Sequence, residues 1–409
     1  MSIKKSIYSL FLIGVMGLSG NAISAVYESN YDFSPEHEIL YSKWVQEKVS
    51  HDIFSNPNSP YYGIKTDCAD AAFALRAIFA YEQKLSIEFK DNDGQIISEK
   101  TKRFDLVTND ELKKLKSFIA YIGENSGSEV LARENTYPIA LKSIRPGDLY
   151  ITRWINSKGE DTRHVYIIKE VLPTGDFVLF SSTQPRAIRP LLSRKGMPLH
   201  LFKERPFGFR RFIEKSNSRE NESLEQYQLV KLGESRFFGM VKDGLKIKED
   251  TLQLNIERRI ENICLALKTR KDVVDLALQE KGVLTKKCFT NMQYEEYSTP
   301  SRDNNIIQDI ERLRNGFKSI IRSNQLNELN AETILSLENL IGENNSTEAF
   351  NSMAQLCSIP IELTSKKPIK VNIRSFYDRF KAGLISSNPN ESIDARWGFE
   401  KESKQCLVK

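Results

Sequence analysis

The chain has 409 residues, and its 59 Lys and Arg against 54 Asp and Glu give a formal net charge of +5 at pH 7. This near balance gives no reason to expect a nucleic acid partner. Apolar residues make up 40% of the chain, which is enough for a packed core. The length suits two domains of about 150 to 200 residues each.

The start of the chain has the order of a secretory signal peptide. Lys4 and Lys5 are followed by an apolar run over 7–18 and then by small residues up to Ala25. This order predicts cleavage after Ala25, leaving a periplasmic or secreted protein. The apolar run is shorter than the about 20 residues of a membrane span. We therefore favour a cleaved signal over an uncleaved anchor, and expect no stable membrane insertion.

Helices are predicted to dominate the first part of the mature chain. Apolar spacing and turn residues place them at 35–50, 67–82 and 110–121, with strands around a turn between 85 and 107. The helix at 67–82 is rich in Ala, and such small side chains let neighbouring elements approach closely. We expect this helix to be central and buried.

From Arg145 onward the pattern changes to strands. They are expected at 149–154, 164–171, 177–182 and 207–212, and the second and third are joined by a hairpin turn. Helices followed by strands of this kind predict an α+β domain.

The second half of the chain has mostly helical periodicity. Apolar residues recur at helical spacing over 256–281, 306–326 and 332–341, and a polar segment at 215–222 resembles a linker. The expected organisation is a signal peptide at 1–25, an α+β domain at 26–215 and a mostly helical C-terminal domain at 216–409.

The cysteines indicate how the chain is crosslinked. An exported chain meets an oxidising compartment, where paired cysteines tend to form disulfides. There are five, so at least one stays unpaired within the chain. Four lie in the C-terminal half, which favours two disulfides there and a free thiol at Cys68. Proximity in sequence suggests the pairs Cys264–Cys288 and Cys357–Cys406.

Cys68 is the candidate nucleophile. Thr66 or Asp67 can cap the Ala-rich helix, which puts Cys68 in its first turn, where free N–H groups favour an anion. A thiol at such a site is expected to have a lowered pKa, and the same N–H groups can hold an oxyanion. The alternative is a small buried core residue, but an exported Cys without a nearby partner favours a functional role.

A thiolate mechanism needs a general base, and His164 is the candidate. It opens an apolar strand, and a His at a strand end projects a rigid imidazole toward a cleft. The other histidines lie within a helix, just past it, or in a loop: His37, His51 and His200.

These residues together resemble the NlpC/P60 cysteine peptidases, which are small papain-like enzymes that cut peptide bonds in bacterial cell walls. The resemblance implies a papain-like fold with the nucleophile helix packed on an antiparallel sheet. It assigns Cys68 as nucleophile and His164 as base, and it places Tyr62 and Asp67 at the substrate. It covers residues 60–85 and 145–185. The matching dipeptides are Tyr62-Gly63, Asp67-Cys68, Gly147-Asp148 and His164-Val165.

The third catalytic residue departs from the family pattern. In the family a polar residue from the strand after the hairpin orients the His, and here Ser181, Ser182 or Gln184 would have to serve. We take Ser181 as the candidate. The run from Cys68 to Ala72 also resembles a transglutaminase-like core, in which the same third position would be Asp. That relative implies acyl transfer.

Other signals in the sequence are weaker. There is no Walker loop, no dinucleotide-binding Gly pattern and no zinc spacing, so we expect no cofactor and no metal. A basic stretch over 186–211 is expected to be a solvated surface, with an anion-binding site as the alternative. The polar-aromatic segment 294–303 is expected to be a surface loop, or else to line a cleft between the domains.

The sequence thus predicts an exported cysteine hydrolase that cleaves an amide bond, most simply in peptidoglycan stem peptides. The expected partner is peptidoglycan or a cell-wall peptide, and the helical domain would position the wall or a protein partner. The alternative is a catalytically silent protein that binds the wall and keeps the fold.

Overall fold

The computed structural model describes residues 25–104, 110–155, 159–213, 219, 221–283, 288–366, 368–403 and 406. The expected signal peptide lies outside the described residues except for Ala25. The described chain is 48% helical and 16% strand, and its main sheet is antiparallel, so the α+β expectation is confirmed. Among these residues no helix is both long and apolar enough to cross a membrane.

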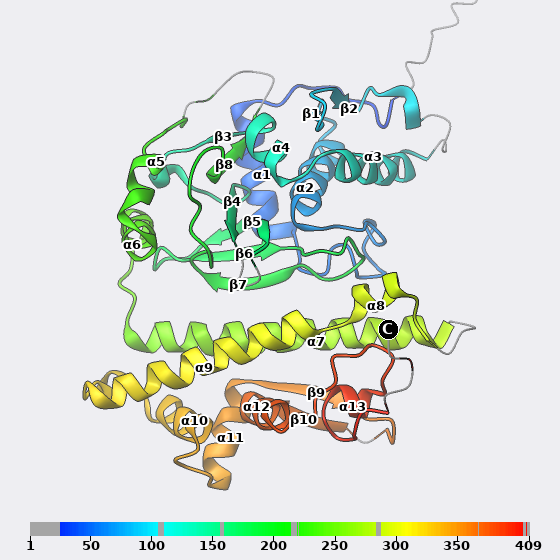
Figure 1. Cartoon of the computed structure of the whole chain (residues 1–409). Helices are drawn as coiled ribbons and strands as arrows, with labels where there is room; N and C mark the ends of the chain where they lie inside the picture. Colours follow the sequence, from blue (N-terminus) through cyan, green and yellow to red (C-terminus); the bar gives the residue numbers. More distant parts are fainter. Residues whose placement is uncertain are drawn as a thin grey trace, which may run out of the picture.

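A single sheet organises the N-terminal half, which we define as residues 25–245. In the described part it has six strands in the order β3-β8-β4-β5-β6-β7, and every neighbouring pair is antiparallel (Figure 1). The strands are β3 (Thr136–Pro138), β4 (Leu149–Ile155), β5 (Asp161–Val171), β6 (Phe177–Ser181), β7 (Leu192–Gly196) and β8 (Gly208–Phe212).

Helix α2 (Cys68–Glu82) is the central helix of this half. Every residue from Cys68 to Ala80 is buried, which confirms the expectation drawn from its Ala content. Around it lie α1 (Pro35–Lys48), the hairpin of β1 (Glu88–Lys90) and β2 (Ile96–Ser98), α3 (Glu111–Asn125), α4 (Ser128–Glu134), α5 (Gln226–Leu229) and α6 (Glu234–Leu245).

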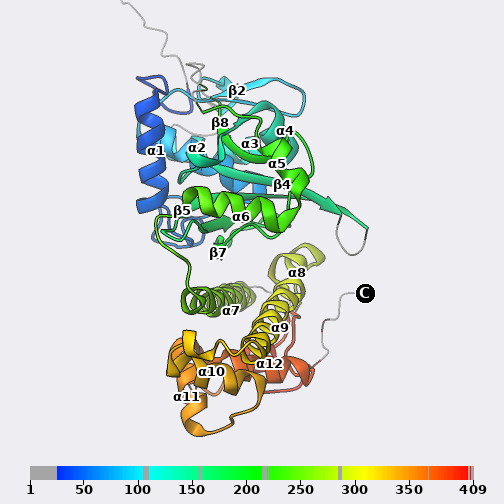
Figure 2. The ribbon, with the colours of Figure 1, turned by 90° about the vertical axis from the view of Figure 1, so that its left-hand side faces the viewer.

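The C-terminal half, residues 252–406, is built on two long helices. Helix α7 (Leu252–Val283) runs below β7, and α9 (Pro300–Arg322) crosses it (Figures 1 and 2). A hairpin of β9 (Ser358–Glu362) and β10 (Pro368–Asn372) was not expected from the sequence. The remaining helices are α8 (Asn291–Tyr297), α10 (Ala331–Ile341), α11 (Thr347–Leu356), α12 (Ile373–Lys381) and α13 (Ile393–Arg396).

The described residues form two hydrophobic cores that divide between α6 and α7. The buried residues of the first core run from Val26 to Val241, and those of the second from Ile256 to Trp397. Helix α6 belongs to the first core because Phe237 lies fully buried against the sheet residue Phe209, with ring centroids 6.3 Å apart. Along the chain, the boundary between the two cores therefore lies between Val241 and Ile256, after the polar segment 215–222.

The two halves are joined by polar contacts along β7. The side chain of Asn262 on α7 accepts a hydrogen bond from the backbone N–H of Lys195 at 2.6 Å and donates one to its carbonyl. Strand β7 is at the edge of the sheet, where unpaired backbone groups could pair with another chain and cause aggregation. Helix α7 covers this edge and so prevents such pairing. In the turn between β5 and β6, the Asp176 carboxylate forms ion pairs with Lys242 on α6 and Arg258 on α7.

The cysteine pairing differs from the one that sequence proximity suggested. All five cysteines are described, and the pairs at disulfide distance are Cys264–Cys357 and Cys288–Cys406, with Cα atoms 5.6 Å apart in each. Two C-terminal disulfides and a free Cys68 were expected, and that division is confirmed. The suggested connectivity is wrong because the packing of α7 brings its cysteine against the end of α11 instead.

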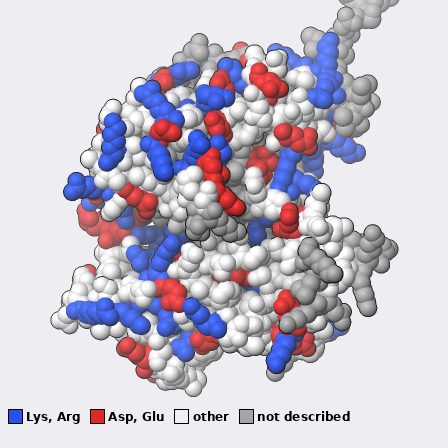
Figure 3. Space-filling view, viewed as in Figure 1, with Lys and Arg blue, Asp and Glu red and all other residues white. Residues whose placement is uncertain are grey.

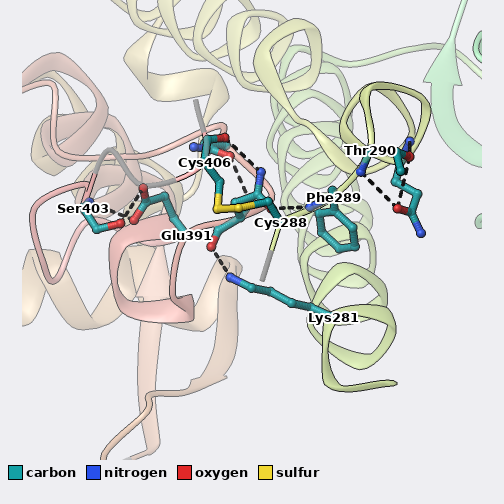
Figure 4. Close-up of a disulfide and its surroundings, with 10 residues drawn as sticks. Lys281, Cys288, Phe289, Thr290, Glu391, Ser403 and Cys406 are labelled. Carbon is teal, nitrogen blue, oxygen red and sulfur yellow. Dashed lines mark hydrogen bonds between the residues drawn. A yellow bond between two sulfur atoms is a disulfide. The ribbon is translucent and has the colours of Figure 1, made fainter. Parts of the chain in front are cut away.

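Hydrogen bonds surround the Cys288–Cys406 pair (Figure 4). The Asn390 side chain accepts from the backbone N–H of Phe289 at 2.9 Å and donates to the Cys406 carbonyl at 3.3 Å. The ammonium group of Lys281, near the end of α7, donates to the Asn390 carbonyl. These bonds fasten the end of the chain to α7.

Candidate active site

The first turn of α2 is held in place by a capping box. Asp67 is the N-cap, and its carboxylate accepts from the N–H groups of Ala69 at 3.1 Å and Asp70 at 3.3 Å. The Asp70 carboxylate accepts in return from the N–H of Asp67 at 3.0 Å. Cys68 is therefore the first helical residue, as the sequence predicted.

The segment before Cys68 is fastened to the end of the sheet. Thr66 exchanges backbone hydrogen bonds with Ala187, and its hydroxyl donates to the Ser182 hydroxyl at 3.2 Å. The Ser182 hydroxyl donates to the Thr66 carbonyl at 3.1 Å. These contacts fix the position of the α2 N-terminus relative to β6.

The same arrangement brings Cys68 to the strand that carries His164. Pairing between β5 and β6 begins at Ile167, so on the side that faces β6 the residue Val165 lies outside the paired region. The backbone N–H groups of Ala69 and Val165 lie near the Cys68 thiol and favour its ionised form. Since Val165 directly follows His164, the thiol lies against the backbone next to the candidate base.

Cys68 and His164 both line a cavity of about 1030 Å³ between the two halves. No hydrogen bond joins the thiol to the imidazole in the described part of the chain. Catalytic hydrogen bonds are often long in a ligand-free site, so this separation does not exclude the pair. Asp67 and Ser181 also line the cavity, while α7 and α9 supply its opposite wall. In Figure 3 a groove runs between the two halves, with Lys and Arg side chains beside it.

The thiol of Cys68 is not activated in the free protein. Burial and, to a smaller extent, the neighbouring Asp67 carboxylate raise its pKa to about 12, although two backbone N–H groups oppose the shift. The expectation of a lowered pKa is therefore wrong. The main reason is burial, which disfavours the charged thiolate, and the Asp67 carboxylate adds a negative charge beside the sulfur.

His164 is neutral at physiological pH. Burial and, to a smaller extent, the nearby His200 lower the pKa of its imidazole to about 4. The ring packs edge-on against Tyr166, with centroids 4.6 Å apart, and neither ring nitrogen has a hydrogen-bond partner among the described residues. The imidazole is thus available as a base, but no hydrogen bond from the described residues orients it.

The position of the third catalytic residue, which would orient His164, can be located from the pairing register of β5 and β6. Ile167 pairs with Phe180, so Ser181 comes opposite Tyr166, and continuing the register sets Thr183 opposite His164. Ser181 lines the cavity but makes no hydrogen bond to His164. The Ser182 hydroxyl is occupied by Thr66. A group that could orient the imidazole would therefore come from Thr183 or Gln184, which also line the cavity.

Tyr62 does not line this cavity. Its side chain is 42% exposed, and its carbonyl accepts a hydrogen bond from Lys116 at 2.8 Å. It lies near Tyr297 of α8, whose pKa its hydroxyl helps to raise. The structure thus separates Tyr62 from the other four predicted site residues, which line the cavity: Asp67, Cys68, His164 and Ser181.

The basic stretch over 186–211 is largely buried or paired, so the expectation of a solvated surface is wrong for most of it. Arg211 binds the buried Asp148 through two hydrogen bonds of 2.6 and 2.8 Å. Arg186 pairs with Asp70 at 2.8 Å, and Arg194 with Asp309 at 3.4 Å. Their partners lie far away in sequence, so local composition could not reveal them.

Helix α3 approaches the site through Gly123. A Cβ atom there would lie 2.5 Å from Oδ1 of Asp70 and 2.5 Å from Nη2 of Arg186. The glycine therefore allows α3 to pack against the capping box. A Gly within a helix is itself a sequence signal for close packing, but the sequence does not say against what.

The segment 294–303 forms α8 and the first turn of α9. Arg302 lines the cavity, which favours the alternative of a cleft-lining segment over a surface loop. In the described part of the chain no group of three His, Cys, Asp or Glu side chains could hold a metal ion.

Comparison of the sequence with protein family models finds no match, and searches of curated proteins and of solved structures find none either.

Proposed function

We propose that the protein is an exported cysteine hydrolase that cleaves an amide bond in peptidoglycan stem peptides. The observation that carries the proposal is that Cys68, at the N-terminus of a buried helix, and His164, on the adjoining strand, line one cavity. A helix packed on an antiparallel sheet, with Cys before His in the chain, supports a papain-like reading of the N-terminal half. The substrate class follows from the expected export and from the NlpC/P60 resemblance.

The two pKa shifts define the starting state of the reaction. A thiol with a pKa of about 12 and an imidazole with a pKa of about 4 are both neutral near pH 7, so no thiolate–imidazolium pair is formed beforehand. The proton must then move during the attack, as it does from a serine hydroxyl. We expect that binding of the substrate, which displaces water from the cavity, aligns the Cys68 thiol with the His164 imidazole.

Each step can be written for these residues. His164 removes the proton from Cys68 as the sulfur attacks the amide carbon, and backbone N–H groups near Cys68 would hold the oxyanion. The proton passes to the amide nitrogen as the C–N bond breaks, which leaves a thioester and a free amine. His164 then deprotonates a water that attacks the thioester, and the proton returns to the sulfur.

The second candidate function is a catalytically silent wall-binding protein. The observation that favours it is the neutral thiol combined with a His164 ring that lacks an orienting hydrogen bond in the described part of the chain. In that case the cavity would bind a wall peptide without cutting it.

Release of soluble fragments from purified peptidoglycan separates the two functions. Hydrolysis predicts that Cys68→Ala abolishes release and that His164→Ala lowers it about 100-fold or more. His51→Gln is the matched control, because His51 does not line the cavity, and it should release fragments like the parent. Equal release by the parent, Cys68→Ala and His164→Ala would refute the mechanism. Sedimentation with peptidoglycan but no release by the parent would support the silent protein.

A further inference from the structure

Two arginines, one from each half, make no ion pair within the described residues. Arg189 follows β6 and is 4% exposed, and Arg302 is in the first turn of α9 and lines the cavity. Burial and the charge of Arg302 together lower the pKa of Arg189 to about 10. The charges of the two guanidinium groups, one from each half, therefore act on each other unfavourably.

Three of their N–H groups have no partner. The Nε of Arg189 and the Nε and Nη2 of Arg302 are buried and make no hydrogen bond. Arg189 donates once, through Nη2 to the Thr183 carbonyl at 2.7 Å. Within the described residues neither arginine makes an ion pair. Buried polar groups are nearly always satisfied, and an unpaired buried charge destabilises a fold by several kcal/mol or more.

The acidic groups nearby make no ion pair with these two arginines in the described part of the chain. Asp67 and Glu296 act on Arg189 through their charge, but the Asp67 carboxylate is engaged as the cap of α2. Asp303 follows Arg302 in sequence and is bound by Arg270 at 2.6 Å. Its remaining hydrogen bonds come from Thr299 and Ser387. The site thus keeps buried guanidinium donors without a partner.

We propose that Arg189 and Arg302 form a subsite for a carboxylate of the peptide whose amide reaches Cys68. Two guanidinium forks match the planar geometry of a carboxylate and can replace the missing partners with charge-assisted hydrogen bonds. The Thr183 to which Arg189 is anchored also lines the cavity, so the carboxylate would enter from the side of His164. This inference rests on the proposed function, since it names the substrate group that the cavity selects.

The subsite also explains what the C-terminal half contributes. Arg302 comes from α9 and Arg189 from the N-terminal half, so a bound carboxylate would bridge the two halves over the cavity. Substrate recognition would then depend on a helical part of the chain for which the NlpC/P60 resemblance offers no counterpart.

Binding can be measured without catalysis on the full chain carrying Cys68→Ala. The probe is the stem tripeptide L-Ala–γ-D-Glu–diaminopimelate, compared by calorimetry with the same peptide whose carboxylates are amidated. The subsite predicts that the free acid binds at least about tenfold more tightly. Arg302→Gln should remove this preference, while Arg322→Gln, at the exposed end of α9, should keep it. Equal binding of the two peptides would overturn the proposal.

The unfolding temperatures of the parent and of Arg302→Gln, measured in buffer free of polyvalent anions, show whether the substitution acts through lost stability. If Arg302 serves a ligand, Arg302→Gln removes an unpaired buried charge and leaves the unfolding temperature unchanged or higher. A lower unfolding temperature would show that Arg302 has a structural role, and would overturn the proposal. Arg302-dependent binding of inorganic phosphate without binding of the tripeptide would overturn the peptide assignment. A preserved carboxylate preference in a protein without hydrolase activity would uphold the subsite and reject the proposed function.

Discussion

Alkylation of the single free thiol provides a quantitative test of the site. With both disulfides intact, Cys68 is the cysteine that iodoacetamide can modify. The thiolate is the reacting species, so the rate follows its fraction. A pKa of about 12 against an ordinary value of 9.0 makes that fraction about a thousandfold smaller in the folded protein. Burial of the sulfur adds to this protection.

The assay compares folded protein with protein unfolded in urea without reductant, using intact mass to follow the addition. We expect the folded protein to react at least about a thousandfold more slowly at pH 7.5, with a rate that rises about tenfold per pH unit up to pH 10. Asp67→Asn should speed the reaction, because Asn caps a helix as well as Asp but carries no charge.

Fast labelling of the folded protein would refute this reasoning. A rate within tenfold of the unfolded protein at pH 6, or a rate that stops rising below pH 8, would require a thiolate–imidazolium pair that these contacts do not produce. An unchanged rate in Asp67→Asn would show that the neighbouring carboxylate does not influence the thiol.

Three further predictions concern stability. The pKa of His164 lies at about 4 in the folded protein and near 6.5 in the unfolded chain, so the unfolded chain binds the extra proton as pH falls. The free energy of unfolding should fall by up to about 3 kcal/mol between pH 6.5 and 4, and this slope should be missing in His164→Gln, as measured by urea titration. Asp303→Ala leaves the buried Arg270 unpaired, so urea titration should show that the free energy of unfolding falls by about 3–5 kcal/mol. A fall of less than about 1 kcal/mol would contradict the buried pair. Gly123→Ala places a Cβ against Asp70 and should cost about 1–3 kcal/mol. Its control is Gly239→Ala on α6, where the space is open and the change should stabilise the protein by up to about 1 kcal/mol.

The local elements could be predicted from the sequence because their signals are local. Apolar spacing gave the long helices α7 and α9, and the hairpin turn before Phe177 gave the pairing of β5 with β6. Asp67 and the Ala-rich run after it gave the start and the burial of α2. The count and distribution of the cysteines separated Cys68 from the other four.

The features that sequence reasoning missed depend on contacts between distant parts of the chain. Which cysteines pair was decided by how α7 packs against α11, and Arg211 is buried because Asp148 lies beside it. The pKa of Cys68 depends on burial and on the charge of the neighbouring Asp67 carboxylate. The Arg189–Arg302 pair comes from residues more than a hundred positions apart that meet between the two halves.

The most direct test of the central claim is detection of an acyl group on Cys68. Parent protein is mixed with the stem peptide, quenched in acid within seconds and digested, and the peptide containing Cys68 is analysed by mass spectrometry. Covalent hydrolysis predicts the mass of the acyl fragment on Cys68, its loss on mild alkaline treatment, and its absence in Cys68→Ala. Cleavage of the stem peptide at the parent rate by Cys68→Ala, with no adduct on Cys68 in the parent, would contradict the account.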